Sequence, residues 1–127
     1  MTPGACIAAA IDILAAIAPG ERPADDVAAD YFRRRRYIGA KDRTHISGHV
    51  YGVLRHRAAL DWWIARVSKG EVAVEARSRM IAALALLNGQ TQDDLAANFD
   101  GDRFRPAPVI RTKVQFFCIS AIERLPV

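Results

Sequence analysis

Apolar residues recur at three- and four-residue intervals along almost the whole chain, and proline or glycine interrupts them after every few turns. The first segment lies between Thr2-Pro3, a typical helix start, and Pro19-Gly20, a helix stop. Its apolar residues fall on one face of a helix: Ile7, Ile11, Leu14 and Ala18. No segment alternates apolar and polar residues as a half-buried strand would, so the pattern predicts an all-α chain.

The same spacing predicts further helices separated by short turns. They are expected at 23–39, from Asp42 onward, through 58–67 (as a continuation of the preceding helix or after a bend), at 74–87, from Thr91 onward, and from Pro108 to 125. Asn88-Gly89 is the stop signal of the helix at 74–87, and Thr91 with Asp94 has the pattern of a capping box. In the helix at 74–87, the residues expected to point inward are Met80, Ile81, Leu84 and Leu87. The expected fold is a compact bundle of about six or seven helices.

The length and composition fit a single domain over residues 1–127. A chain of 127 residues with 51% hydrophobic residues can bury a sizeable core. Cys6 and Cys118 each lie in an apolar run, where a lone thiol usually behaves as a small buried hydrophobe. No apolar run approaches the roughly 18 residues that a membrane span needs. We therefore expect a soluble, cytoplasmic domain that has no membrane partner.

Positive charge is concentrated in one stretch of the sequence. The whole chain carries a net charge of +4, whereas residues 31–57 hold eight Arg or Lys residues and one Asp, a net charge of +7. Such local basicity is typical of a surface that binds a polyanion. A planar guanidinium can also contact two phosphate oxygens at once. The candidate RNA-binding residues are Arg33, Arg34, Arg35, Arg36, Lys41, Arg43, Arg55 and Arg57.

A purely structural explanation exists for the four adjacent arginines. They fall at the C-terminal end of the helix expected at 23–39, where cations interact favourably with the helix dipole by about 0.3–1 kcal/mol each. That effect fades within the last turn, so it hardly requires four guanidinium groups in a row. Contact with RNA or another polyanion is the preferred interpretation, and a solvated helix end is the alternative.

Gly48 and Gly52 lie one turn apart on the helix expected from Asp42 onward. Each costs about 1 kcal/mol relative to alanine in a helix interior, so their presence calls for an explanation. A neighbouring helix that crosses closely there is slightly favoured. The alternative is a ligand backbone that approaches the bare helix beside Arg55.

The three histidines of the chain fall along another stripe of the same helix: His45, His49 and His56. A pair of histidines one turn apart can hold a metal ion, but a third ligand at usable spacing is missing. We expect these side chains to face solvent or RNA, and we expect no metal site.

Motifs for enzyme chemistry are missing from the sequence. It contains no glycine-rich nucleotide loop, no P-loop and no serine elbow. No arrangement of cysteine, histidine and acid can be assigned. The chain is therefore expected to be a binding module without catalytic residues.

Three segments together resemble a known family: "MTPGACIAAAIDILAAI", "YFRRRRYIGAKDRTHISGHVYGVLR" and "FDGDRFRPAPV". They resemble the N-terminal region of bacterial RsmB-type rRNA (cytosine-5) methyltransferases, which has the all-helical fold of the transcription antitermination factor NusB. The resemblance covers nearly the whole chain, and its most specific parts are "RRYIGAKDR" and "HVYGVLR".

The resemblance implies a division of labour between two domains. In the family, the helical N-terminal domain helps to engage rRNA, and a C-terminal Rossmann-like domain binds S-adenosylmethionine and uses a cysteine nucleophile. The cofactor loop and the Pro-Cys motifs of that second domain are missing here. We therefore expect an excised or truncated RNA-binding accessory domain that needs no cofactor, with S-adenosylmethionine bound only by a missing C-terminal methyltransferase domain.

Two other functions remain open. One is a free-standing NusB-like factor in transcription antitermination or ribosome assembly. The other is a protein-interaction module whose arginines dock an acidic partner. The sequence leaves the oligomeric state open.

Overall fold

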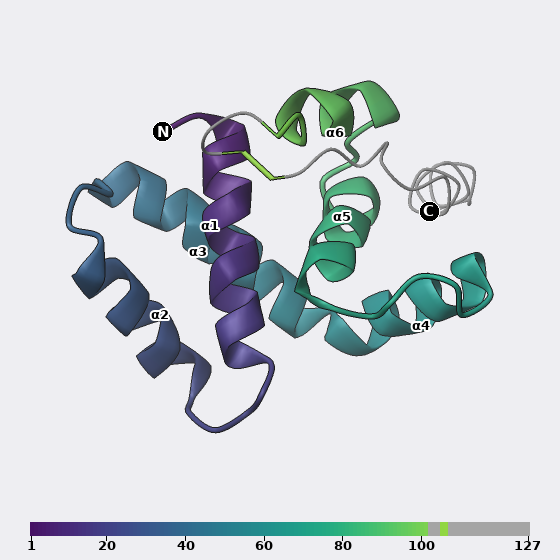
Figure 1. The fold of residues 1–127 in the computed structure, drawn as a ribbon, viewed down its shortest axis with the longest axis horizontal. Coiled ribbons are helices and arrows are strands. Elements are labelled where there is room, and N and C mark those ends of the chain that lie inside the picture. The colour runs from purple at the N-terminus through teal and green to yellow at the C-terminus, as the bar shows by residue number, and fades with distance from the viewer. Residues whose placement is uncertain (102–104, 107–127) are drawn as a thin grey trace.

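The computed structural model describes residues 1–101, 105 and 106, and all of the regular structure in them is helical (Figure 1). The described helices are α1 (Pro3–Ile17), α2 (Ala24–Arg34), α3 (Ala40–Arg55), α4 (Arg57–Ser68), α5 (Ala76–Leu86) and α6 (Gln92–Asn98). The prediction of an all-α bundle is confirmed. The helix expected from Pro108 to 125 lies outside the described residues.

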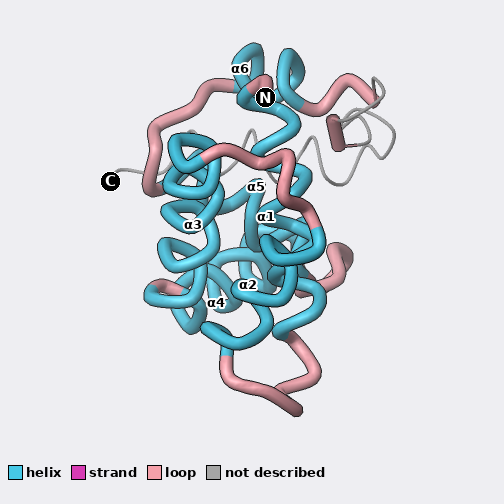
Figure 2. Tube along the Cα trace, turned by 90° about the vertical axis from the view of Figure 1, so that its left-hand side faces the viewer, coloured by secondary structure: helices cyan, strands magenta, loops and turns pink. Residues whose placement is uncertain are grey.

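Helix α1 is the centre of the bundle. It packs against α2, α3, α5 and α6, and α4 packs against α5 and α3 (Figure 1). The Thr2 hydroxyl accepts a hydrogen bond from the Ala5 amide at 3.1 Å, which satisfies a free N–H at the start of α1, as the sequence predicts. Seen from the side of α2 and α3, α6 lies at one end of the bundle and the α1–α2 loop at the other (Figure 2).

A single apolar core joins the helices. Its central members are at most 1% exposed and come from α1, the α2–α3 turn, α3, α4, α5 and α6 with its C-cap: Ile7, Ile13, Ile38, Ile46, Val50, Leu60, Ile64, Met80, Leu84, Leu95 and Phe99. The alanines of α1 let neighbouring helices approach closely. At Gly4 the approach is closer still, because an added Cβ would lie 2.8 Å from the carbonyl oxygen of Asn98 at the end of α6.

The capping signals in the sequence are confirmed, but several boundaries differ. Asp94 and Thr91 form the expected reciprocal capping box of α6, with hydrogen bonds of 3.0 and 3.2 Å. Helix α3 starts two residues before Asp42, because Gly39 is its N-cap and Asp42 lies in the first turn. The chain bends at His56 and restarts as α4, so the second of the two expectations for this segment holds.

The expected inward position of Leu87 is wrong. Met80, Ile81 and Leu84 are buried, whereas Leu87 is 43% exposed. Leu87 is the C-cap of α5, where the chain leaves the helix towards Gly89. Gly89 has φ of 67°, a conformation that favours glycine. The prediction that Asn88-Gly89 stops the helix is therefore confirmed.

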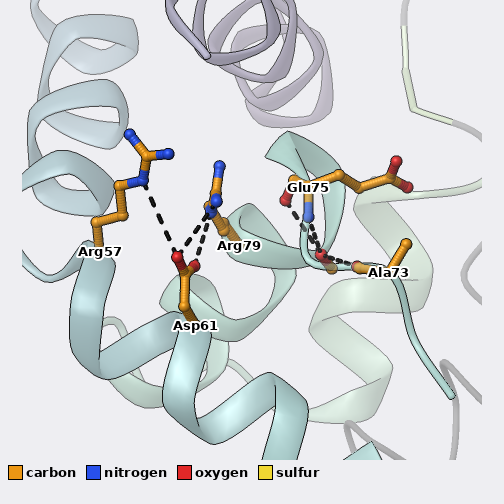
Figure 3. A network of polar contacts seen from close by, with 6 residues as sticks. Arg57, Asp61, Ala73, Glu75 and Arg79 are labelled. Carbon is orange, nitrogen blue, oxygen red and sulfur yellow. Dashed lines mark hydrogen bonds and ion pairs between the residues drawn. The ribbon is translucent and has the colours of Figure 1, made fainter. Parts of the chain in front are cut away.

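A polar network ties α4 to α5 (Figure 3). The Arg79 guanidinium donates to both oxygens of Asp61, at 2.7 and 3.2 Å, and Arg57 lies 4.0 Å from the same carboxylate. Ser78, at the start of α5, donates to the carbonyl of Ala73 at 2.6 Å and accepts from the amide of Glu75 at 2.9 Å. The Arg79–Asp61 contact holds the start of α5 against α4, and the Ser78 contacts hold the preceding loop to α5.

The variant Asp61→Asn is expected to lower the free energy of unfolding by about 1.5 kcal/mol, near the lower limit for a hydrogen bond to a charged group because Asp61 is partly exposed. The loss arises because the Arg79 side chain, only 13% exposed, keeps its charge without a carboxylate partner. Urea unfolding measures it. The exposed Glu71→Gln variant is the matched control and should change stability by less than about 0.5 kcal/mol. Equal effects of the two variants would contradict this role for Asp61.

Candidate nucleic-acid interface

The α2–α3 turn carries the most exposed part of the basic stretch. Helix α2 ends at Arg34, and Arg35 leaves the helical conformation with φ of −124° and ψ of 65°. The chain then turns so that Ile38, 1% exposed, enters the core, and its amide donates to the Arg35 carbonyl at 3.1 Å. The prediction that all four arginines lie in the last helical turn is therefore wrong, because burial of Ile38 ends the helix earlier.

Apart from Arg43, which is exposed but donates to a backbone carbonyl, three cations at this turn are exposed and form no ion pair with a carboxylate in the part of the chain that the structure describes: Arg34, Arg36 and Lys41. They occupy the end of α2, the turn and the start of α3, so their backbones belong to one short segment of eight residues. Their charges are available to an anion. This is the arrangement that a phosphate backbone requires.

Arg33 differs from these three because it is partly neutralised. Its guanidinium forms an ion pair of 2.6 Å with Asp30, one turn earlier on α2. Arg22 binds the other oxygen of Asp30, also at 2.6 Å. The hydrogen bond from Arg22 and the charges of both arginines hold the pKa of Asp30 below its usual value. Arg33 therefore contributes less free positive charge than its neighbours.

Arg35 and Arg43 make contacts that stabilise the turn, although Arg43 is exposed and Arg35 is half-buried. The Arg35 guanidinium lies 3.8 Å from the centre of the Tyr31 ring and donates to the Tyr31 carbonyl at 3.5 Å. The Arg43 Nε donates to the Ile38 carbonyl at 3.0 Å, and its guanidinium lies 5.7 Å from the Phe32 ring. Both side chains stabilise the conformation that presents Arg34 and Arg36.

The remaining two candidates lie elsewhere. Arg55 ends α3 and donates to the Tyr51 carbonyl at 3.3 Å, and Arg57 starts α4 and pairs with Asp61. A helix as long as α3 spans about 24 Å, so these residues lie far from the α2–α3 turn. The structure therefore brings together six of the eight candidates, which we call the junction patch: Arg33, Arg34, Arg35, Arg36, Lys41 and Arg43.

The expected close helix crossing at Gly48 and Gly52 is wrong. A Cβ added at either position would meet no atom within 4 Å outside the local helix. The two glycines instead line an open groove of about 380 Å³ between α3 and α5, together with His45 and His49. The alternative, a ligand approaching the bare helix, is compatible with this geometry.

The histidines of α3 differ in exposure. His45 and His56 are exposed, and the His56 Nδ1 lies 3.0 Å from the Gly52 carbonyl oxygen. Burial, and secondly the nearby His45, lower the pKa of His49. Within the described residues, no group of three or more His, Cys, Asp or Glu side chains could hold a metal ion.

Because folding lowers the pKa of His49, acid is expected to destabilise the protein through this residue. Below about pH 6.5 the His49 imidazole is protonated more readily in the unfolded chain than in the folded chain, and this difference favours unfolding. The free energy of unfolding should therefore fall as pH decreases from 7.5 to 5.5, and that of the His49→Gln variant should fall less steeply. Urea unfolding across this range measures the difference. Identical slopes for the two proteins would contradict a lowered pKa of the half-buried His49.

Cys6 is buried, as the sequence predicts, and its Sγ lies 4.0 Å from Asp42. Burial and the Asp42 charge raise the pKa of the thiol, which disfavours the nucleophilic thiolate. Cys118 lies outside the described residues.

One exposed aromatic residue at the α2–α3 turn is not among the candidates that the sequence indicates. Tyr37 directly follows the four arginines and is 77% exposed. Its signal was its position, because an aromatic residue beside a basic run is a common feature of RNA-binding surfaces.

Comparison of the chain with protein-family models, with curated proteins and with solved structures finds no match. No helix in the described ranges combines the length and apolarity needed to cross a bilayer.

Proposed function

We propose that this domain binds RNA through the junction patch. The observation that carries the proposal is that Arg34, Arg36 and Lys41 are exposed, adjacent and unpaired by any carboxylate among the described residues. Phosphate contacts supply most of the non-specific affinity of RNA-binding proteins, and they need cations that are free of internal partners. Arginine at two of the three positions favours bidentate contact with phosphate oxygens.

The sequence resemblance supports a more specific role. On that basis we propose an rRNA-binding accessory domain of a cytoplasmic rRNA (cytosine-5) methyltransferase, in which methyl transfer belongs to a C-terminal domain. A reading frame that continues downstream of Val127 into a glycine-rich cofactor loop would support this role. A stop codon there would favour the free-standing NusB-like factor.

A salt titration tests the RNA proposal. A fluorescent single-stranded RNA of eight nucleotides should bind with log K falling linearly with log salt, with a slope of about −2 for three phosphate contacts. An acidic peptide of equal charge is the control for docking of a protein partner. Stronger binding of the peptide, or undetectable RNA binding at low salt, would replace RNA by an acidic protein.

A further inference from the structure

The junction patch borders a cavity of about 630 Å³ between α1 and the end of α2. Ala5, Ala8 and Ala9 of α1 form part of its lining, and their small side chains leave the space open. Arg35, a member of the junction patch, and Tyr37 also line it, so the cavity directly adjoins the junction patch. This volume lies within the range of small-molecule sites, and one nucleobase is among the smaller ligands of that range.

The cavity offers two planar groups on which a base can stack. The Arg35 guanidinium is held over the Tyr31 ring at 3.8 Å, which keeps it ordered without a ligand. Tyr37 is 77% exposed, so packing against the core does not explain its position. Proteins that bind single-stranded RNA stack unpaired bases on aromatic rings and on arginine planes.

The cavity also contains an acceptor for a base edge. Asp12 lines it from α1, together with Tyr31 of α2 and Arg35, which directly follows α2. Burial raises the pKa of Asp12 above its usual value, and the positive charge of Arg35 and a hydrogen bond from Tyr31 oppose that rise. A carboxylate accepts a hydrogen bond from the amino group of cytosine, whereas uracil presents a carbonyl oxygen at the same ring position.

We propose that this cavity holds one unstacked nucleobase of a single-stranded RNA, with Tyr37 and Arg35 as stacking surfaces and Asp12 as acceptor for an exocyclic amino group. The proposal rests on the proposed RNA binding at the junction patch. Phosphates on either side of the flipped base would lie against Arg34 and Arg36. The cavity selects cytosine over uracil, while the junction patch supplies affinity that is independent of sequence.

The test compares three eight-nucleotide RNAs: oligo(C), oligo(U) and an abasic analogue with the same phosphates. The wild-type domain should bind oligo(C) roughly tenfold more tightly than the abasic analogue. Tyr37→Ala should remove this difference and keep the affinity for the abasic analogue, and Tyr37→Phe should behave as the wild type. Asp12→Asn should reduce the preference for oligo(C) over oligo(U).

Two outcomes would overturn the cavity proposal while leaving RNA binding intact. One is equal wild-type affinity for oligo(C) and the abasic analogue. The other is equal weakening of both by Tyr37→Ala with an unchanged melting temperature. A preference for oligo(C) that survives Asp12→Asn would remove Asp12 from the proposal. Undetectable binding of all three RNAs at low salt would instead refute the proposed function itself.

Discussion

Replacing Arg34 and Arg36 by glutamate should lower the affinity for RNA by about 100-fold. Each arginine supplies at least one hydrogen bond between charged groups, worth about 1.5 kcal/mol, and the two losses together correspond to roughly that factor. The two new carboxylates add repulsion. Fluorescence anisotropy with the eight-nucleotide RNA measures the change. These two positions are better choices than Arg35, because Arg35 also braces the turn through Tyr31.

The matched control reverses the same amount of charge away from the junction patch. Arg66 and Lys69 are exposed at the C-terminal end of α4, on the opposite side of the bundle from the α2–α3 turn (Figure 1). Arg66→Glu combined with Lys69→Glu should weaken RNA binding only a few-fold, through long-range electrostatics. Equal losses for the two double variants would mean that net charge, rather than the junction patch, determines binding.

The variant Ile13→Ala should destabilise the protein by about 2–5 kcal/mol. Ile13 is fully buried in α1, the helix that packs against four others, so the cavity left by truncation has little freedom to collapse. The midpoint of urea unfolding should fall with little change in the slope of the transition. This loss is a large part of the stability of a domain of this size.

A smaller truncation at the same position should destabilise the protein less. Ile13→Val removes one methylene group and should cost about 0.5–1.5 kcal/mol. A cost below 1 kcal/mol for Ile13→Ala would show that α1 is not the centre of a close-packed core. Loss of cooperative unfolding for Ile13→Val would likewise contradict the modest cost expected from one methylene group.

Much of the fold could be predicted because its signals are local. The cap at Thr2, the capping box at Thr91 and the stop at Asn88-Gly89 each depend on residues within one or two turns. Burial of Ile46 and Val50 follows from helical periodicity alone. Such features need no knowledge of how the helices pack together.

The predictions that are wrong concern features that depend on how the helices pack together. Helix α2 ends early because Ile38 must reach the core, and nothing in the sequence marks that requirement. The close approach expected at Gly48 occurs instead at Gly4, where the end of α6 meets α1. A glycine shows that space or freedom is needed, but only the tertiary arrangement shows where.

The candidate interface could be predicted only in part. The density of positive charge indicates the basic stretch. The sequence alone does not show that Arg55 and Arg57 lie far from the junction patch in the folded chain. The Asp30–Arg33 pair follows from spacing within one helix and could have been anticipated. Pairing of Arg57 with Asp61 likewise follows from the i,i+4 spacing within α4. Pairing of Arg79 with Asp61 depends on how α4 packs against α5 and could not be anticipated.

The central claim is that an RNA backbone binds where α2 meets α3. Amide chemical shifts of the isotopically labelled domain, recorded during titration with the eight-nucleotide RNA, test it directly. We expect the largest changes in residues 33–43, with little change at Arg55, Arg57 or along α4. Changes confined to α4 and α5, or none at all under conditions where RNA is bound, would contradict it.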